Sequence, residues 1–171
     1  MAYETLTRSL RDASLVIKDD SANQITVSTD EGDLTWTENI DVKEIIQRGV
    51  IKHALAGNEQ ACDVSFTTRF TELIGVSSEE APYAALHNIV PADGWVSHAR
   101  DAAEVYQVQL IFTVNTPMAS PGVGDVDYET ITFAYFYVTT LTFTEGDDYS
   151  TLAVTGRDFE TRPTIVRTAG T

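Results

Sequence analysis

Apolar residues recur at every second position along most of this chain, and this period is the strongest constraint on its fold. The clearest run is residues 61–72, in which Val64, Phe66 and Phe70 fall on one side of an extended chain and polar residues fall on the other. Such alternation is typical of an antiparallel sheet with one covered face and one wet face. Threonine is abundant in the same runs, and its branched Cβ favours strands. The chain is therefore predicted to be mainly β.

Clusters of Gly, Asp, Asn and Ser separate the predicted strands. We expect strands at 13–18, 24–29, 33–38, 41–47, 50–56, 61–72, 104–114, 128–136, 138–145 and 150–156. Residues 42–55 also fit an amphipathic helix. Gly49 would weaken the centre of that helix by ~1 kcal/mol, so a long hairpin or ordered loop that turns at Arg48-Gly49 is preferred.

One short helix is predicted in the middle of the chain. Ser77 and Glu80 have the spacing of a capping box, and Asn88 can end the helix. Pro82 conflicts with a start at Ser77 unless the proline lies in the first turn. The helix is therefore expected to begin near residue 81.

Residues 115–127 form the longest predicted loop, which is rich in Pro, Gly and small residues. Loops of this length are usually functional. No linker or internal repeat divides the chain, so residues 1–171 are predicted to form one domain. No stretch approaches the ~20 apolar residues of a membrane span, and the N-terminal residues lack the apolar core of a secretory signal.

Charge is distributed unevenly along the chain. The net charge of −15 argues against a surface that binds nucleic acid, because neutralisation of phosphates supplies most of that affinity. Residues 101–156 contain eight carboxylates and no Lys or Arg. The same segment is rich in aromatic and β-branched residues, which disordered acidic segments lack. We therefore expect a folded wall whose negative charge is uncompensated.

No residue pattern indicates catalysis, a cofactor or a metal site. The three histidines share no metal-ligand spacing, and the chain has no glycine-rich phosphate loop or nucleophile elbow. Asp125, Asp127 and Glu129 resemble the start of a calcium loop. The pattern then fails at Thr130 and Phe136, where glycine and glutamate would be required.

The long threonine-rich strands need partners for their edges, because free edges invite aggregation. Few charged residues interrupt residues 105–144. Natural proteins close such edges by forming a barrel or by pairing with another subunit. Closure across subunits produces a ring.

Three segments of the chain are similar to major tail tube proteins of long-tailed bacteriophages. They are residues 32–75, 78–86 and 133–163. The shared motifs are a Gly-x-Leu-x-Trp strand at 32–36, turns at 47–49 and 57–59, a strand at 64–66, Pro82-Tyr83, and a Phe-x-Glu-Gly-Asp hairpin at 143–147. The resemblance rests on their order and spacing over roughly residues 10–165. Two departures are the long segment 115–127 and Ala61-Cys62, which stands where a Pro-Val-like pair is usual.

The resemblance implies an antiparallel β-sandwich or split barrel with one short α-helix, long loops, and terminal arms near 1–12 and 157–171. It implies a homo-oligomer, usually hexameric, whose strands join into one inner barrel. Rings stack into a tube through which genomic DNA passes without being bound, so no enzyme activity and no cofactor are expected. The other implied partners are tape-measure, baseplate and terminator proteins. The implied location is the virion tail, assembled in the host cytoplasm.

Residues can be assigned to two roles within that framework. The candidate acids that line the bore are Asp63, Glu129 and Glu145, whose charge would repel DNA over a screening length of ~8 Å. Ring stacking is expected from parts of 39–60, 115–127 and 157–171. The candidate stacking residues are Arg48, Gly49, Pro117, Pro121 and Gly124.

Two other interpretations stay open. A carbohydrate-binding or adhesin β-sandwich would use a dense aromatic cluster around Tyr135. The cluster consists of Tyr128, Phe133, Tyr135, Phe136 and Tyr137. A tail completion or baseplate ring protein would share most features of a tube protein.

Overall fold

A computed structural model describes residues 13–27, 34–69, 81–88, 95–115, 128–146 and 150–168. These ranges contain ten strands and one helix. They are β1 (Ala13–Lys18), β2 (Gln24–Val27), β3 (Thr35–Thr37), β4 (Val42–Gln47), β5 (Val50–Ala56), β6 (Cys62–Arg69), α1 (Pro82–His87), β7 (Val108–Asn115), β8 (Tyr128–Thr144), β9 (Thr151–Asp158) and β10 (Thr164–Thr168). The prediction of a mainly β, antiparallel protein with one short helix is confirmed.

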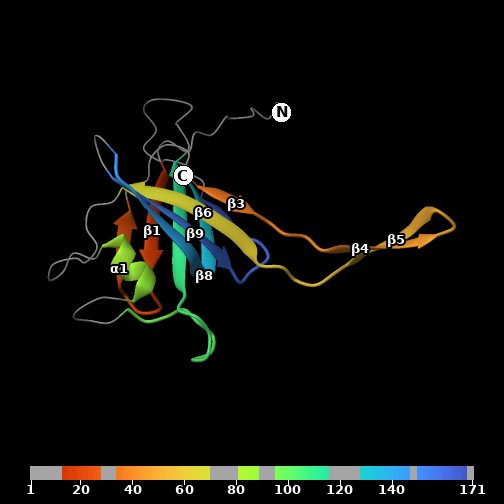
Figure 1. Ribbon diagram of the computed structural model, residues 1–171, viewed down its shortest axis with the longest axis horizontal. Coiled ribbons are helices and arrows are strands. Elements are labelled where there is room, and N and C mark those ends of the chain that lie inside the picture. The colour runs from red at the N-terminus through yellow and green to blue at the C-terminus, as the bar shows by residue number, and fades with distance from the viewer. Residues whose placement is uncertain are drawn as a thin grey trace.

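Eight strands form one antiparallel sheet in the order β2-β1-β7-β8-β9-β6-β3, with β10 also paired to β8. We refer to this sheet and α1 together as the body. β8 connects its two halves. The first part of β8 pairs with β7 and β10, whereas residues 136–144 pair with β9. Figure 1 shows β6 and β9 running obliquely across the direction of β1.

β8 differs from the sequence prediction. Two strands were expected, at 128–136 and 138–145, but a single strand of 17 residues spans both. The register shifts between Val138 and Thr140, and the Thr139 hydroxyl donates to the Thr155 carbonyl at 3.1 Å. A bulge therefore shifts the register without ending the strand.

The hydrophobic core lies between the two halves of the sheet. β6 supplies Val64 and Phe66 to the core, and both side chains are buried, while Ser65 between them is partly exposed. The predicted alternation is thus confirmed, although Phe70 lies outside the described residues. Phe133 and Phe136 of β8 are fully buried in the same cluster.

α1 covers part of this core. Its buried residues are Ala84, Ala85 and Leu86, and Pro82 occupies the first turn, as expected. Asn88 adopts the left-handed conformation and its N–H donates to the Ala84 carbonyl, which ends the helix. The possible capping-box residues Ser77 and Glu80 lie outside the described residues.

β4 and β5 form a separate two-stranded sheet, which we call the arm (residues 42–56). Figure 1 shows the arm standing away from the body. Arg48 and Gly49, between its strands, both have positive φ, at 53° and 78°. Two-residue hairpin turns of type I′ require this conformation. The preference for a hairpin over an amphipathic helix is confirmed.

Two other segments differ from expectation. β7 begins at Val108 rather than at residue 104, because residues 97–107 close a loop. Within this loop, the Gln107 N–H donates to Ser97 Oγ at 3.0 Å, and the His98 N–H donates to the Gln107 carbonyl at 2.9 Å. The described part of the expected C-terminal arm is also no free arm, since β10 pairs with β8 of the same chain. The described part of the chain contains no helix long and apolar enough to cross a membrane.

Candidate functional site: assembly surfaces

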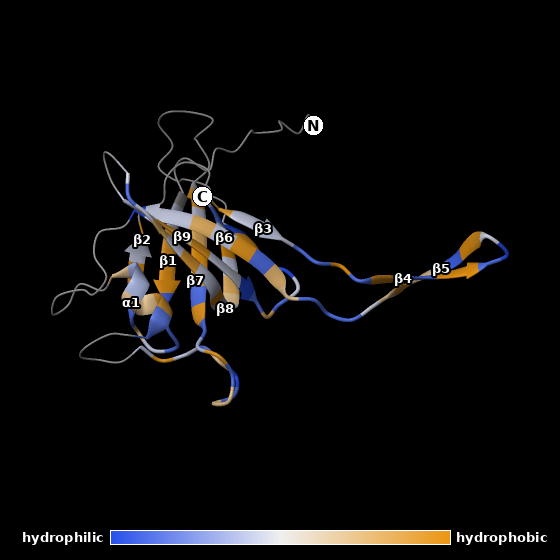
Figure 2. Cartoon of the chain, viewed as in Figure 1, coloured by the Kyte–Doolittle hydropathy of each residue, from blue (hydrophilic) through white to orange (hydrophobic). Residues whose placement is uncertain are grey.

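The arm carries the largest group of exposed aliphatic side chains in the described part of the chain. They are Val42, Ile45, Ile46, Val50, Ile51 and Leu55. Figure 2 shows hydrophobic stretches along both β4 and β5. An isolated two-stranded hairpin is marginally stable in water, and contiguous exposed apolar surface usually marks an interaction site. The arm is therefore the first candidate surface for a partner.

The strand register assigns the arm residues to two faces. On what we call face A, the cross-strand pairs are Val42 with Ala56, Glu44 with Ala54, and Ile46 with Ile51. On face B, the pairs are Lys43 with Leu55, Ile45 with His53, and Gln47 with Val50. The register shifts between Ile45 and Ile46, which leaves Lys52 unpaired in the ladder. Each face thus presents three large aliphatic side chains.

The charge of the arm is opposite to that of the rest of the chain. Lys43, Arg48 and Lys52 are basic, and Glu44 is the one acidic residue between positions 42 and 56. The net charge of the arm is +2. Because the whole chain has a net charge of −15, the residues outside the arm have a net charge of −17. The arm is a cationic, apolar element on a strongly anionic protein.

Hydrogen bonds between the segment before β4 and the segment after β5 fix the base of the arm, which we call the neck. The Gly57 N–H donates to the Asp41 carbonyl at 2.8 Å, and the Asn58 N–H donates to Asp41 Oδ2 at 2.9 Å. Gly57 has no room for a side chain, because a Cβ there would overlap the Asp41 carboxylate. Asn39 donates to the Ala61 carbonyl at 2.9 Å.

Asp63 belongs to the neck as well as to β6. Its Oδ2 accepts a hydrogen bond from Asn39 Nδ2 at 2.8 Å, and its Oδ1 accepts one from Arg157 Nε at 2.7 Å. The hydrogen bond from Asn39, together with the bond and charge of Arg157, lowers the pKa of Asp63. Asp63 lies on the wet face as expected, but its charge is compensated.

The other two candidate bore acids lie elsewhere. Glu129 is in the first part of β8, where the register places it opposite Arg167 of β10. Glu145 follows the last residue of β8 and is exposed. Asp63 and Glu145 lie at opposite ends of the β6–β9–β8 region, because Asp63 is level with Arg157 while Glu145 adjoins the Thr144–Thr151 pair. The structure does not bring the three acids together.

The expected carboxylate wall is not present in the described strands. Within β7 and β8, the one acidic residue is Glu129. Asp101 and Glu104 lie in the loop before β7, where both accept hydrogen bonds from backbone N–H groups of the same loop. Asp125 and Asp127 lie outside the described residues, as do Asp147 and Asp148.

Hydroxyl groups cover the wet face of β3, β6, β9 and the second half of β8, which we call the hydroxyl face. The serine and threonine residues paired across this face are Thr35, Thr37, Ser65, Thr67, Thr140, Thr142, Thr144, Thr151 and Thr155, and Tyr137 lies on the same face. The charged residues on this face are Asp63, Arg69 and Arg157. Threonines at every second position were visible in the sequence, but only the register shows that four strands bring them together.

Two edges of this four-strand region carry no partner among the described strands. β3 pairs with β6 on one side only. Residues 137–144 of β8 pair with β9 on one side, whereas the pairs with β7 and β10 end at Phe136 and Thr132. Unpaired edges of this kind are templates for pairing with another chain.

The aromatic cluster predicted around Tyr135 does not form one platform. Phe133 and Phe136 are core residues with no exposed surface. The Arg100 guanidinium lies 4.1 Å from the centre of the Tyr135 ring, and Tyr137 packs on Phe159 with ring centres 5.3 Å apart. The cluster is therefore divided between the core and two separate surface contacts.

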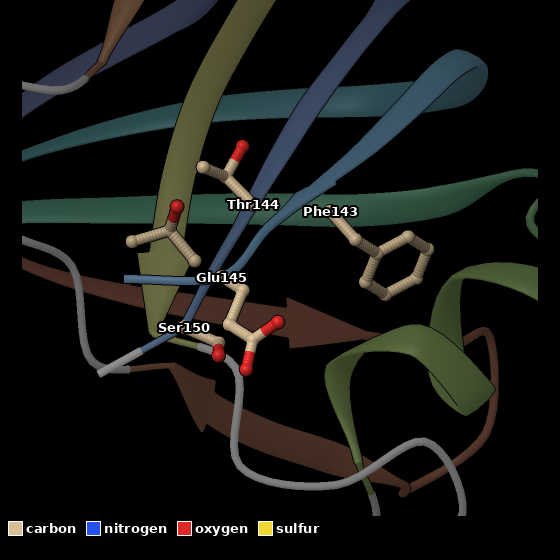
Figure 3. A pocket seen from close by; sticks show the side chains of 5 residues that line it. Phe143, Thr144, Glu145 and Ser150 are labelled. Carbon is tan, nitrogen blue, oxygen red and sulfur yellow. The ribbon is translucent and has the colours of Figure 1, made fainter. Parts of the chain in front are cut away.

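A shallow pocket lies at the end of the β8–β9 hairpin (Figure 3). Its volume is about 280 Å³, and it is lined by Phe143, Thr144, Glu145, Ser150 and Thr151. The ring centre of Tyr83 lies 5.6 Å from that of Phe143. This pocket combines an exposed aromatic ring with hydroxyl groups and one carboxylate.

Several predicted site residues cannot be placed. Pro117, Pro121 and Gly124 lie outside the described residues, whereas Arg48 and Gly49 form the tip of the arm. Among the residues that the structure describes, no group of three or more His, Cys, Asp or Glu side chains could hold a metal ion.

The chain has no significant match among protein-family models, curated proteins or solved structures. Function is therefore inferred from the arm, the hydroxyl face and the open sheet edges. All three are features of a surface that contacts other molecules.

Proposed function

We propose that this chain is a structural subunit that assembles with copies of itself into rings, and that stacked rings form the tail tube of a long-tailed bacteriophage. The arm carries the proposal, because its exposed aliphatic side chains have no cover in the described part of the same chain. The sequence resemblance to tail tube proteins supports the same function. The body would then be the β-sandwich or split barrel of that family.

The open edges supply a way to close a ring. Pairing of the β3 edge of one copy with the β8 edge of the next would continue the sheet from subunit to subunit. This contact joins two different surfaces, and such heterologous contacts close into rings when the rotation allows. Closure also removes edges that would otherwise aggregate.

The hydroxyl face would line the bore of such a ring. Its opposite face is covered by the core and by the β2-β1-β7 layer. The outer circumference of a ring offers more room than the inner one, so the bulky covered side belongs outside. The inner wall would then be nearly neutral rather than carboxylate-lined.

A hydroxyl lining suits a conduit for DNA. Fixed cations would bind phosphates and release counterions, which would hold the duplex. Threonine hydroxyls contact hydrated phosphates without that gain. The face has two basic residues, Arg69 and Arg157, and Arg157 forms a salt bridge with Asp63 at 2.7 Å. Passage of DNA would thus depend on the scarcity of basic residues on this face.

The arm would connect rings. Its strands are six and seven residues long and so extend about 20 Å, and the Arg48-Gly49 turn would reach the next ring. Tape-measure, baseplate and terminator proteins would be the other partners in the virion tail. A completion or baseplate protein would show isolated rings in place of tubes.

Association of the purified protein tests the proposal. Sedimentation velocity over a wide concentration range should show ring-sized or larger particles for the full chain. A variant with residues 42–56 replaced by a short Gly-Ser turn should assemble at concentrations tenfold higher or more. A full chain that remains a monomer at every concentration and ionic strength would contradict the proposal.

A carbohydrate-binding module is the second candidate function, and the Phe143 pocket favours it. Aromatic rings beside hydroxyl and carboxylate groups are suited to sugar rings. Glycan binding by a stable monomer, lost in Phe143→Ala but kept in Phe159→Ala, would support this function. Phe159 is a matched control, because it is exposed to a similar degree at 48% against 47%.

A further inference from the structure

Both faces of the arm carry exposed aliphatic side chains. On face A, Val42, Ile46 and Ile51 are 52%, 63% and 54% exposed, and on face B, Ile45, Val50 and Leu55 are 46%, 61% and 50% exposed. Glu44 is the one polar residue in the pairs of face A, whereas each aliphatic residue of face B pairs with a polar one, namely Lys43, His53 or Gln47. An ordinary amphipathic hairpin keeps its large aliphatic residues on one face, but here each face has three. Both faces therefore need cover.

A hairpin that lies flat on one partner buries one face only. Three large aliphatic side chains would then remain in water on the other face, whichever face is used. Insertion between two bodies buries all six. Because burial of each such side chain is favourable, a two-sided site accounts for the residues on both faces.

Charge identifies the bodies that cover the arm. The arm has a net charge of +2, whereas the remainder of the same chain carries −17. A second copy of this protein therefore attracts the arm electrostatically, and a third copy does so equally. Opposite charges also bring copies together in a defined orientation. Duplex DNA is the other anionic partner, but it offers no apolar surface that could cover both faces.

We infer that the arm of one copy inserts between two other copies, which cover face A and face B. This inference rests on the proposed self-assembly and adds how the arm is held within the assembly. Each arm would then join three subunits. Loss of either face should weaken the assembly, whereas flat docking makes only one face important.

Ile45 and Ile46 provide a direct test, because they are neighbours in β4 and point to opposite faces. Ile45→Cys and Ile46→Cys are made separately and treated with a small maleimide. Both thiols should react in dilute monomer, and both should be protected at least tenfold in assembled particles. Cys62 is fully buried and serves as the internal background. Protection of only one position would overturn the inference.

Paired substitutions keep the test valid if a cysteine disturbs the arm. Ile46→Thr with Ile51→Thr removes apolar surface from face A, and Ile45→Thr with Leu55→Thr removes it from face B, while threonine preserves strand propensity. Each pair should raise the concentration needed for assembly at least tenfold. Val166→Thr on β10, 52% exposed, is the matched control and should change it less than twofold. An effect from one face alone would contradict a two-sided site.

The outcomes separate this inference from the proposed function. Tubes with one reactive face would overturn the inference and leave the tube function intact. Particles that are neither rings nor tubes, but protect both positions, would support the inference and contradict the tube function. A protein that is always a monomer would overturn both. Salt-sensitive binding of a fluorescent DNA duplex by the monomer, abolished by Lys43→Glu with Lys52→Glu, would also overturn the inference.

Discussion

Asp19 and Asp158 are both fully buried, yet their pKa values move in opposite directions. Burial raises the pKa of each carboxyl. At Asp19, hydrogen bonds outweigh the effect of burial, and the pKa is lowered. The donors are the backbone of Val96 and Ser21 and the side chains of Ser21 and Asn23. Asp158 has fewer donors, chiefly the Tyr135 N–H at 2.7 Å, so burial dominates and raises its pKa to about 6.

Asp158 should make the stability of the protein depend on pH between about 4 and 6. Its folded pKa lies above its unfolded value, so the native state binds the proton more tightly and loses stability as pH rises through this window. The loss relative to Asp158→Asn should reach about 2 to 3 kcal/mol near pH 7. Urea unfolding at pH 4 and pH 7 measures it. A difference between the two proteins that does not change with pH would contradict this assignment.

Asp19 should contribute strongly to the free energy of unfolding, because it joins the turn after β1 to a segment that is distant in the sequence. Its Oδ2 accepts a hydrogen bond from the Val96 N–H at 3.0 Å. Asp19→Ala leaves buried donors without an acceptor and should lower the free energy of unfolding by about 3 kcal/mol. Asp20→Ala is the control, since Asp20 is exposed and its loss should cost less than about 1 kcal/mol. Equal losses in urea unfolding would disprove this contribution of Asp19.

Among the secondary-structure elements, the predictions that rest on local sequence patterns are confirmed. The alternation around Val64 and the Arg48-Gly49 turn each depend on local chemistry, and both predictions are confirmed. Predictions failed where distant residues decide the outcome. β7 starts late because Ser97 and His98 bind Gln107. β8 continues through a bulge between Val138 and Thr140, where the sequence predicted two separate strands.

The neck is an element whose effect on assembly can be tested apart from the body. Gly57→Val places a side chain where the Asp41 carboxylate lies. The arm should then no longer be held in a fixed orientation relative to the body, while the core of the body stays unchanged. Assembly should require at least tenfold more protein, and the melting temperature of the body should stay within a few degrees. Gln60→Val, at an exposed position in the same segment, is the control. Normal assembly of Gly57→Val would show that the neck geometry is unimportant.

At the scale of the whole molecule, the candidate surfaces were only partly predictable. The exposed arm could be foreseen as a hairpin, and ring stacking was assigned to its turn. The face proposed to line the bore could not be predicted from the sequence, because the register between strands decides which side chains share a face. The structure pairs Asp63 with Arg157 and groups threonines from four separate strands on one face. That grouping requires pairing between strands far apart in the sequence.

If the hydroxyl face lines a nearly neutral bore, as proposed, an added positive charge on it should retain DNA. Thr155 lies near the centre of the hydroxyl face, in β9 between β6 and β8. Thr155→Lys should make assembled particles retain a short fluorescent DNA duplex at low salt and release it at high salt. Wild-type particles should retain little. Val166→Lys, on β10 outside this face, should behave like wild type. Equal retention by both variants would exclude the hydroxyl face as the bore.

Electron cryo-microscopy of the assembled protein would show directly how the copies are arranged. Rings or tubes are expected in which β3 of one subunit pairs with β8 of the next, the hydroxyl face lines the bore, and each arm lies between neighbouring copies. Particles without a bore, or rings whose inner wall is formed by β1, β2 and β7, would contradict this arrangement.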